Sequence, residues 1–487
     1  MKDIINPNIF LNNHPINNIN VINDININDK TKDYIKLILP KIKSIAKRLS
    51  FYEKIYEVDK NFFNKLVTER IFDINLFGEY NQEKVNHYCH PKYNKDYLLH
   101  NYKFMIKMII NSFNNYFQNQ YNIDIYDKRL CYFKPNALGL KSSKSKIIEI
   151  LKIKNFNNFD NYFAMGNFEI LSEIEIEIQK KFDSFFHNEK FIDILFNVIK
   201  FFTINLSFLD NFLDKYLEIP KSNILIVGSE SRILSKLLKY KLINKDIEIH
   251  SYEHGARSLL FKSDFEILEE QRLLNVTKYY FSSSGQYKNA LRNDNIKNKI
   301  QISKNIEPKI SKVIGKKFKF SNNKKILYIM TNTDYNGLII RQPNGILFFH
   351  YRNIFHKLTN FLENNNYYFK IKAHPDSIIL FNKNKNYVNK PFLKLINDFD
   401  ILLFDHSTST AFCESLVSNK KIILIDHKQN EFESNFKKIV KNRCSIINAN
   451  LDMFGNFSID LDHLRSCIES KDWPSKEIIS QTKSYFS

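Results

Sequence analysis

Short apolar runs that end in polar turns recur from residue 221 onward. The first, Ile224 to Val227, is followed by a Gly-Ser-Glu-Ser turn and by a helical pattern over 233–242. Further segments with the pattern of strands cover 247–252, 278–281, 325–330, 367–372, 401–404 and 422–425. Apolar runs without polar alternation are typical of strands that are buried on both faces of a parallel sheet. The pattern therefore predicts two successive sets of βαβ units, which is a doubly wound α/β architecture.

The pattern divides the chain into three regions. Residues 1–220 begin with an Asn-rich stretch and are then mainly helical by periodicity, including a basic amphipathic helix around Ile38 and Leu49. Residues 221–315 form a first Rossmann-like half, and residues 316–487 form a second half with C-terminal helices. A Lys-rich linker at 306–323 joins the two halves. We expect the halves to face each other across a cleft, with the N-terminal region toward an acceptor or a membrane.

Glycine usage directs attention to the middle of the chain. Only 10 of the 487 residues are glycine, against a usual frequency of about 7%. Six of them lie between Ile224 and Ile346, namely Gly228, Gly255, Gly285, Gly315, Gly337 and Gly345. A chain that avoids glycine is expected to keep it where the backbone needs positive φ or approaches a ligand closely.

The net charge of +20 favours an anionic partner. A phosphate-bearing substrate, an anionic membrane surface and nucleic acid all suit such a charge. The lysines are scattered and no nucleic-acid-binding signature accompanies them, so no nucleic acid is expected as a partner. A basic protein that binds nucleic acid or anionic lipid is the alternative from another functional class. This alternative predicts that ligand binding weakens steeply as the salt concentration rises and shows no preference among nucleotides.

Compartment is indicated by what the sequence lacks. The five cysteines are widely spaced and suggest no disulfide framework. The start has no secretion signal pattern, and no apolar run approaches the roughly 18 residues of a membrane span. We expect a cytoplasmic protein. Its basic charge would also suit a peripheral position on the inner face of the cell membrane.

The strongest chemical signal is the turn after the apolar run 401–404. Asp405 and His406 are followed by four hydroxyl residues, 407–410, and a helical pattern begins there. A helix amino end after a parallel strand is a phosphate-binding place, and the hydroxyls add donors. An ordinary helix cap is the alternative, because Ser and Thr are preferred at any helix start. Glu414, in the first turns of the helix, is placed to accept bonds from ribose hydroxyls.

Two histidines also follow predicted strands. His254 ends the second strand of the first half, and His374 ends a strand of the second half. Ligands of doubly wound sheets sit at the carboxyl ends of strands, so His374 is expected beside the donor phosphate and His254 beside an acceptor hydroxyl. No Asp-x-Asp motif stands at a strand end. We therefore expect a metal-independent reaction without a cofactor, in which the activated donor is a substrate.

These motifs resemble, in their order, those of GT-B glycosyltransferases that use CMP- or CDP-activated donors. The resemblance rests on Lys-Ala-His-Pro at 372–375 and Asp-His-Ser-Thr at 405–408, with His-Gly at 254–255 upstream. The families concerned are capsule Kdo transferases, bacterial sialyl- and polysialyltransferases, and CDP-glycerol glycerophosphotransferases. The similarity covers about 223–427, less than half of the chain.

The resemblance implies roles for individual residues. It implies that the donor's nucleotide and phosphate are bound by His374, Ser407, Thr408, Ser409 and Glu414. We add Lys372 to this set because it lies at a strand end. The glycerophosphotransferases imply His254 as the base, whereas the sialyltransferases imply Glu253; Glu230 is the next choice. Arg257 is placed to hold an anionic acceptor or phosphate.

Two departures from the family pattern leave the donor open. Ala373 stands where an arginine is frequent, and Glu253 stands where an aromatic residue often precedes His-Gly. The prediction is an inverting transferase that moves a sugar or polyol phosphate to a hydroxyl of a surface polysaccharide or lipid-linked acceptor, as in capsule and lipopolysaccharide synthesis. A UDP-sugar transferase and a sugar-nucleotide 2-epimerase are alternatives on the same fold.

Overall fold

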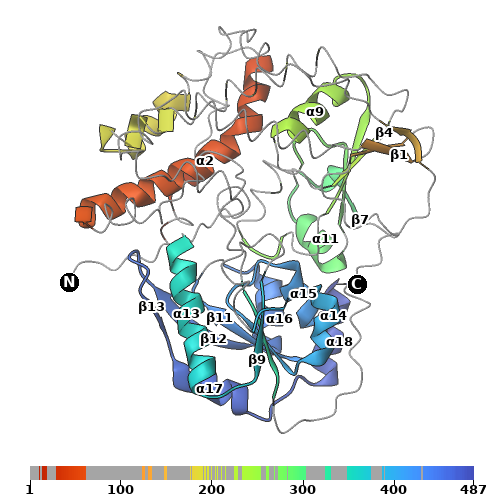
Figure 1. Cartoon of the computed structure of the whole chain (residues 1–487). Helices are drawn as coiled ribbons and strands as arrows, with labels where there is room; N and C mark the ends of the chain where they lie inside the picture. The colour runs from red at the N-terminus through yellow and green to blue at the C-terminus, as the bar shows by residue number, and fades with distance from the viewer. Residues whose placement is uncertain are drawn as a thin grey trace.

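The computed structural model describes two α/β units and part of the N-terminal region (Figure 1). The described residues are 10, 14–18 and 29–61, scattered helical positions between 176 and 214, the strand residues 123–126, 130–133 and 147–150, and most of 224–302, 324–330, 348–373 and 386–486. The predicted linker at 306–323 lies outside them. The two units are the two predicted Rossmann-like α/β halves.

The first sheet has seven described strands in the order β3-β1-β2-β4-β5-β6-β7. Its parallel core consists of β4 (Ile224–Gly228), β5 (Glu248–Tyr252), β6 (Lys278–Phe281) and β7 (Ile300–Ile302). Helix α9 (Ile233–Ile243) connects β4 to β5, and α11 (Ser284–Ala290) follows β6. The predicted strands of this half are confirmed within two residues at each end. The three-residue β7 had not been predicted.

Three further strands of this sheet come from the region predicted as mainly helical. They are β1 (Ile123–Tyr126), β2 (Leu130–Phe133) and β3 (Ile147–Ile150). β2 pairs in parallel with β4, while β1 lies antiparallel between β2 and β3. The edge of β4 has backbone N–H and C=O groups that need hydrogen-bond partners. Pairing with β2 supplies these partners for both strands. The N-terminal region therefore extends the first sheet.

The long helix α2 (Asp29–Val58) packs on the first half. Its apolar residues Ile38, Ile42 and Leu49 are fully buried. The ring of Tyr34 meets that of Tyr240 in α9 edge to face at 6.0 Å. The basic amphipathic helix predicted from sequence is thus a packed element of its own domain. Among the described residues, no helix has the length and apolar character needed to cross a membrane.

The second sheet has six described strands in the order β13-β12-β11-β10-β8-β9. They are β8 (Ile326–Ile329), β9 (Phe369–Lys372), β10 (Ile401–Phe404), β11 (Lys421–Asp426), β12 (Ser445–Leu451) and β13 (Phe457–Ile459). All pairs are parallel except that of β12 with β13. The described helices are α13 (Phe348–Asn364), α14 (Phe392–Leu395), α15 (Thr410–Leu416), α16 (Ser434–Arg443), α17 (Leu461–Glu469) and α18 (Lys476–Phe486).

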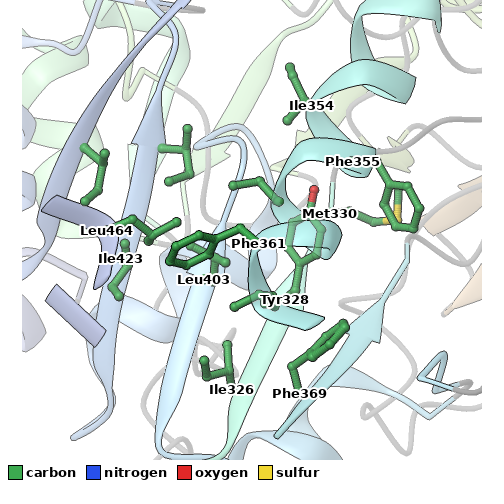
Figure 2. Close-up of a cluster of buried hydrophobic side chains, with 14 of the residues drawn as sticks. Ile326, Tyr328, Met330, Ile354, Phe355, Phe361, Phe369, Leu403, Ile423 and Leu464 are labelled. Atoms are coloured by element: carbon green, nitrogen blue, oxygen red, sulfur yellow. The ribbon is translucent and has the colours of Figure 1, made fainter. Parts of the chain in front are cut away.

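Alternate residues of these strands build two hydrophobic cores. Tyr328 and Leu403 belong to the core under α13 and α17, as Figure 2 shows, with Phe361 of α13 packed over the sheet. Leu402 and Phe404 point into the core under α15, α16 and α18 on the other face. Burial on both faces explains the continuous apolar runs of the sequence. It also leaves the strand ends as the place where polar groups of this half gather.

Helix α18 joins the two halves. The hydroxyls of Ser283 and Ser284, at the start of α11, donate to the carbonyls of Tyr485 and Ser484 at 2.8 and 3.3 Å. These carbonyls belong to the last turn of α18, where a helix has no internal donors. The first half therefore caps a helix of the second, and the serine turn after β6 is engaged in this structural contact.

A buried carboxylate, Glu433, reinforces this junction. It accepts from Asn289 Nδ2 at 3.0 Å and from Arg292 at 3.2 Å, both in the first half. Burial opposes its ionisation, but hydrogen bonds from Ser434 and from two backbone N–H groups of α16, with the nearby Arg292 charge, outweigh burial and lower its pKa. A charged group held this way fixes the register of α16 against α11.

Substituting Gly285 is expected to strain the junction. A Cβ atom at this position would overlap the ring of Tyr485. We expect Gly285→Ala to lower the free energy of unfolding by about 1–3 kcal/mol, the usual cost of overpacking. Chemical denaturation measures the change, with Lys288→Ala on the exposed side of the same helix as control. Equal stability of both variants would contradict the close approach.

Candidate functional site

The carboxyl ends of the parallel strands of the second sheet form one edge, and polar residues follow them. Lys372 is the last residue of β9, Asp405 follows β10, and His427 follows β11. β8 lies between β9 and β10. Since neighbouring strands are about 4.8 Å apart, Lys372 and the turn after β10 are separated by about 10 Å along this edge. The structure thus brings the predicted donor residues Lys372 and Ser407 to the same edge.

Asp405 is the centre of a buried polar cluster. Its Oδ2 accepts from the hydroxyl of Tyr328 in β8 at 2.6 Å, and its Oδ1 lies 2.9 Å from Nδ1 of His406. Its backbone carbonyl lies 2.8 Å from Nε2 of His427. Tyr328, Asp405, His406 and His427 are all buried. The cluster ties the ends of β8, β10 and β11 together.

The acceptors of this cluster determine the tautomers of both imidazoles. A carbonyl only accepts, so His427 donates its Nε2–H to Asp405, and burial lowers the pKa of His427. Likewise, the His406 nitrogen facing the carboxylate carries the proton, so Nδ1–H donates. The pKa of Tyr328 is raised well above its ordinary value, by burial first and then by the charge of Asp405. Tyr328 therefore remains a donor at every ordinary pH.

The hydroxyl turn divides into a cap and a residue available for other contacts. Ser409 Oγ accepts from the backbone N–H of Phe412 at 3.2 Å, so Ser409 is the N-cap of α15. The helix-cap alternative is confirmed for Ser409. Ser407 is 6% exposed, and its hydroxyl makes no hydrogen bond to the described residues. Thr408 is partly buried. The phosphate role of these three residues stays a prediction.

Lys372 and Glu414, the two charged residues predicted for the donor, are both buried. Lys372 Nζ donates to the carbonyl of Ala373 at 2.6 Å, and burial lowers the pKa of its amine. Glu414 lies on a part of α15 that is buried with Phe412 and Cys413. A buried carboxylate there is less accessible to a ribose than the sequence suggested. Its ribose role remains a prediction.

A buried arginine holds the far end of α15. Arg443, at the end of α16, donates from Nε to Leu416 O at 2.8 Å and from Nη2 to Ser418 O and Lys420 O at 2.6 and 2.7 Å. Three carbonyls after α15 thereby obtain donors, and a cation at a helix carboxyl end is electrostatically favourable. Arg443 therefore fixes the helix whose amino end forms the hydroxyl turn.

In the first half, Glu253 is the described candidate. It follows β5, its N–H donates to Tyr280 O at 3.0 Å, and its Oε1 accepts from Gln286 Nε2 at 3.1 Å. Glu253 is half-buried and oriented by this amide. The other first-half candidates, His254, Arg257 and Glu230, lie outside the described residues, as does His374 in the second half. Which residue is the base therefore stays open.

Tyr485 lies between the two groups of candidates. Its pKa is raised by burial first, then by Glu433 and Cys413, with a further contribution from Glu253. Cys413 belongs to α15, and Glu253 follows β5, so ionisable groups of both halves lie within electrostatic range of one phenol. The end of α18 therefore stands near Glu253 on one side and α15 on the other.

Tyr328, His406 and His427 are residues of the Asp405 cluster for which no role was predicted. Their positions carried a usable signal, because His406 and His427 follow strands in the same way as His254 and His374. Tyr328 carried none, since a tyrosine inside an apolar strand is typical core. Among the described residues, no group of His, Cys, Asp or Glu side chains is arranged to hold a metal ion; metal independence remains a prediction.

A surface groove of about 760 Å³ lies elsewhere on the second half. It is lined by α13, α17 and the turn between β12 and β13, including His356, Lys357 and Arg465. Asn353 Nδ2 and Lys357 Nζ bridge it by donating to Gly455 O and Phe457 O at 2.6 and 3.1 Å. The turn at 405–410 contributes nothing to its lining. The groove is therefore separate from the strand-end site.

Comparison with known proteins gives structural neighbours alone. No family model and no curated protein matches the chain. The UDP-GlcNAc 2-epimerase of Methanocaldococcus jannaschii, solved with UDP-GlcNAc and UDP, is 12% identical with a TM-score of 0.33, over 57% of this chain and 78% of the epimerase.

Two further structures resemble this chain to the same degree. Another structure of the M. jannaschii epimerase is 13% identical with a TM-score of 0.31, over 58% of this chain and 79% of the epimerase. The UDP-N-acetylglucosamine 2-epimerase of Rickettsia bellii is 10% identical with a TM-score of 0.31, over 58% of this chain and 75% of that protein. Similarity at this level concerns the fold alone, so a function has to be argued from the residues of this chain.

Proposed function

We propose that the chain is a GT-B-type enzyme that binds the phosphate of a nucleotide-activated sugar at the turn between β10 and α15. The observation that carries the proposal is the edge of the second sheet, where Lys372, Ser407 and the Asp405–His406 pair follow parallel strands. Buried donors with few competing partners bind an anionic group more strongly than exposed ones. The net charge of +20 also favours an anionic substrate.

The reaction we propose is transfer of the sugar, or of a polyol phosphate, to an acceptor hydroxyl. The bond between the transferred group and the nucleotide phosphate breaks as the bond to the acceptor oxygen forms, and the acceptor proton passes to Glu253 or His254. Cationic and hydroxyl groups at the second sheet stabilise the leaving phosphate. CMP- or CDP-activated donors and a surface glycan or lipid-linked acceptor follow from the sequence resemblance.

A sugar-nucleotide 2-epimerase is the second candidate. The observation that favours it is the position of the Asp405–His406 pair, which lies in the donor half beside the hydroxyl turn. Inversion at C2 requires a proton to leave and return at a carbon of the donor itself. Such a reaction needs proton-transfer groups near the donor and no acceptor. UDP-GlcNAc is the probe for this reaction.

A thermal-shift panel tests the proposed binding. CMP, CDP, UMP and UDP are each added to the full chain, and the melting temperature is measured. A ligand that binds the folded state stabilises it by about 2.7 kcal/mol at a hundred times its dissociation constant. We expect at least one nucleotide to raise the melting temperature and nucleosides without phosphate to have no such effect. Absence of a shift with all four nucleotides would overturn the proposal.

Removing the hydroxyl of Ser407 is expected to weaken nucleotide binding. A hydrogen bond to a charged group contributes about 1.5–3 kcal/mol, so Ser407→Ala should raise the dissociation constant roughly 10–100-fold. Calorimetric titration with the nucleotide that gives the largest thermal shift measures this change. Ser466→Ala, on the exposed side of α17, is the matched control. Unchanged affinity in Ser407→Ala would remove this turn from the site.

The two candidate reactions differ in their isotopic signature. An epimerase incubated with UDP-GlcNAc in D₂O introduces deuterium at C2 of the sugar without any acceptor, which ¹H NMR detects. A transferase leaves C2 protonated and releases nucleotide when an acceptor hydroxyl is supplied. We expect acceptor-dependent release from CMP-, CDP- or UDP-activated donors. Deuterium at C2 without nucleotide release would favour the epimerase.

A further inference from the structure

His406 is oriented from two sides. Its Nδ1 lies 2.9 Å from Oδ1 of Asp405, and its ring meets the ring of Phe404 edge to face at 6.3 Å between centroids. Asp405 is itself held by the hydroxyl of Tyr328 at 2.6 Å. An imidazole held by a carboxylate that is itself hydrogen-bonded has one ring position and one tautomer.

This arrangement leaves the second ring nitrogen for another partner. Nδ1 is committed to Asp405, so Nε2 is the atom of His406 that can exchange a proton or bind a ligand. Nε2 makes no hydrogen bond to the described residues. In the chain, His406 directly precedes Ser407, at the start of the turn assigned to the donor phosphate. A purely structural histidine in so buried a place usually satisfies both nitrogens, as His14 does with Ser50 and Ile16.

We propose that His406 binds the nucleotide phosphate as an imidazolium, donating from Nε2–H to a phosphate oxygen, with Asp405 and Tyr328 as positioning residues. The inference rests on the proposed function and adds a residue to its donor site. His406 keeps its proton throughout: the phosphate gains a hydrogen bond, and the acceptor proton still goes to the first half. Charge that develops on the leaving phosphate is met by a fixed cation.

The charges around His406 support this assignment. Asp405 places a carboxylate oxygen 2.9 Å from Nδ1 of His406. His427 donates its Nε2–H to the backbone carbonyl of Asp405, and burial lowers the pKa of this imidazole. Tyr328 is neutral. An imidazolium is therefore the cation that would meet the phosphate at the start of the turn, while Lys372 stands two strands away.

The test is a calorimetric titration of the full chain at pH 5.5, 6.5, 7.5 and 8.5. The ligand is whichever of CMP, CDP, UMP and UDP gives the largest thermal shift. The variants are His406→Asn, which keeps a donor near Asp405 and removes Nε2, and His406→Gln, which keeps a neutral donor near Nε2. His463→Asn, on the exposed side of α17, is the matched control. Each profile is compared with that of the unsubstituted chain, because the phosphate itself titrates in this range.

We expect His406→Asn to raise the dissociation constant about 10–100-fold at pH 5.5, as for a lost charge-assisted hydrogen bond. The difference should be smaller at pH 8.5 than at pH 5.5, because the proposed contact requires a protonated imidazole. His406→Gln should bind more tightly than His406→Asn and share its loss of pH dependence. His463→Asn should follow the unsubstituted chain.

Several results would overturn the inference. Nucleotide affinity and pH profile equal to the unsubstituted chain in both His406 variants would exclude contact with the phosphate. Unfolding of both variants without nucleotide would assign the imidazole a structural role instead. If the unsubstituted chain binds none of the four nucleotides, the proposed function itself fails. If it binds nucleotide and both His406 variants bind equally well, only the role of His406 fails.

Discussion

Replacing Arg443 by methionine is expected to lower the free energy of unfolding by about 3–5 kcal/mol. The guanidinium supplies donors to Leu416 O, Ser418 O and Lys420 O, and the residue is 4% exposed. A buried acceptor that loses its donor costs roughly 1–3 kcal/mol, and relaxation recovers part of the sum. Methionine has a similar length, so a cavity adds little. Burial lowers the pKa of Arg443 to about 10, and the side chain remains charged at pH 7.

Two comparisons make this prediction specific. Arg443→Lys keeps the charge but replaces two separate donor nitrogens, Nε and Nη2, by one, so its loss of stability should be smaller than that of Arg443→Met and still measurable. Arg465→Met removes an exposed arginine of α17 and should cost less than about 0.5 kcal/mol. Chemical denaturation measures all three. Because Arg443 holds α15 in place, a variant that is less stable should also bind nucleotide more weakly. A variant that loses stability but keeps full nucleotide affinity would show that α15 is not part of the nucleotide site.

Acidification from pH 7 to pH 4 is expected to lower the free energy of unfolding by about 3 kcal/mol through His14 alone. Burial first, and then the charge of Lys47, lower the pKa of His14 from 6.5 to about 4. Nδ1 accepts from the N–H of Ile16 at 3.2 Å, and Nε2 faces Ser50 Oγ at 2.9 Å, so the folded protein holds a neutral ring. Below pH 6.5 the unfolded chain binds a proton that the folded chain resists. Stability is therefore complete above pH 6.5 and is lost as the pH falls toward 4.

The variant His14→Asn tests the assignment. An asparagine oxygen can accept from the N–H of Ile16 without titrating, so the variant should be less stable at pH 7 but lose less on acidification. Thermal melts at pH 7, 6, 5 and 4 give the two curves. The pKa of His427 is also lowered, so the stability of the His14→Asn variant should still decrease somewhat as the pH falls. If the melting temperatures of the two proteins fall equally with pH, His14 is not the cause of the loss of stability in acid.

The buried parallel strands could be predicted because burial on both faces leaves a simple pattern. β6 and β10 were placed to the residue, since three aromatic residues in β6 and four apolar or aromatic residues in β10 run directly into a polar turn. β12 was missed because exposed and buried positions alternate along its second half, as in a strand near a sheet edge. The short strand β2 depends on pairing with β4, and β1 depends on pairing with β2 and β3; these are tertiary effects that local sequence does not encode.

The positions of several candidate residues could be predicted, whereas their contacts could not. The rule that ligands sit at strand ends correctly placed Lys372 and Ser407 at one edge of the sheet. It did not reveal that Ser409 caps α15 or that Glu414 is buried, because both depend on how the helix packs. The contact between Tyr328 and Asp405 joins residues 77 positions apart. Only the strand order brings them together.

The capping of α18 by the first half has a consequence for biosynthesis. Ser283 and Ser284 precede their partners Tyr485 and Ser484 by 202 and 200 positions. At about 5–20 residues per second, a ribosome needs on the order of 10–40 s to make that length of chain. During this interval the surface around Gly285 is translated but uncovered, since the ring that fills it has not yet been made. Both halves therefore complete their packing only once α18 has been made, and until then the α11 surface can bind a nascent-chain chaperone.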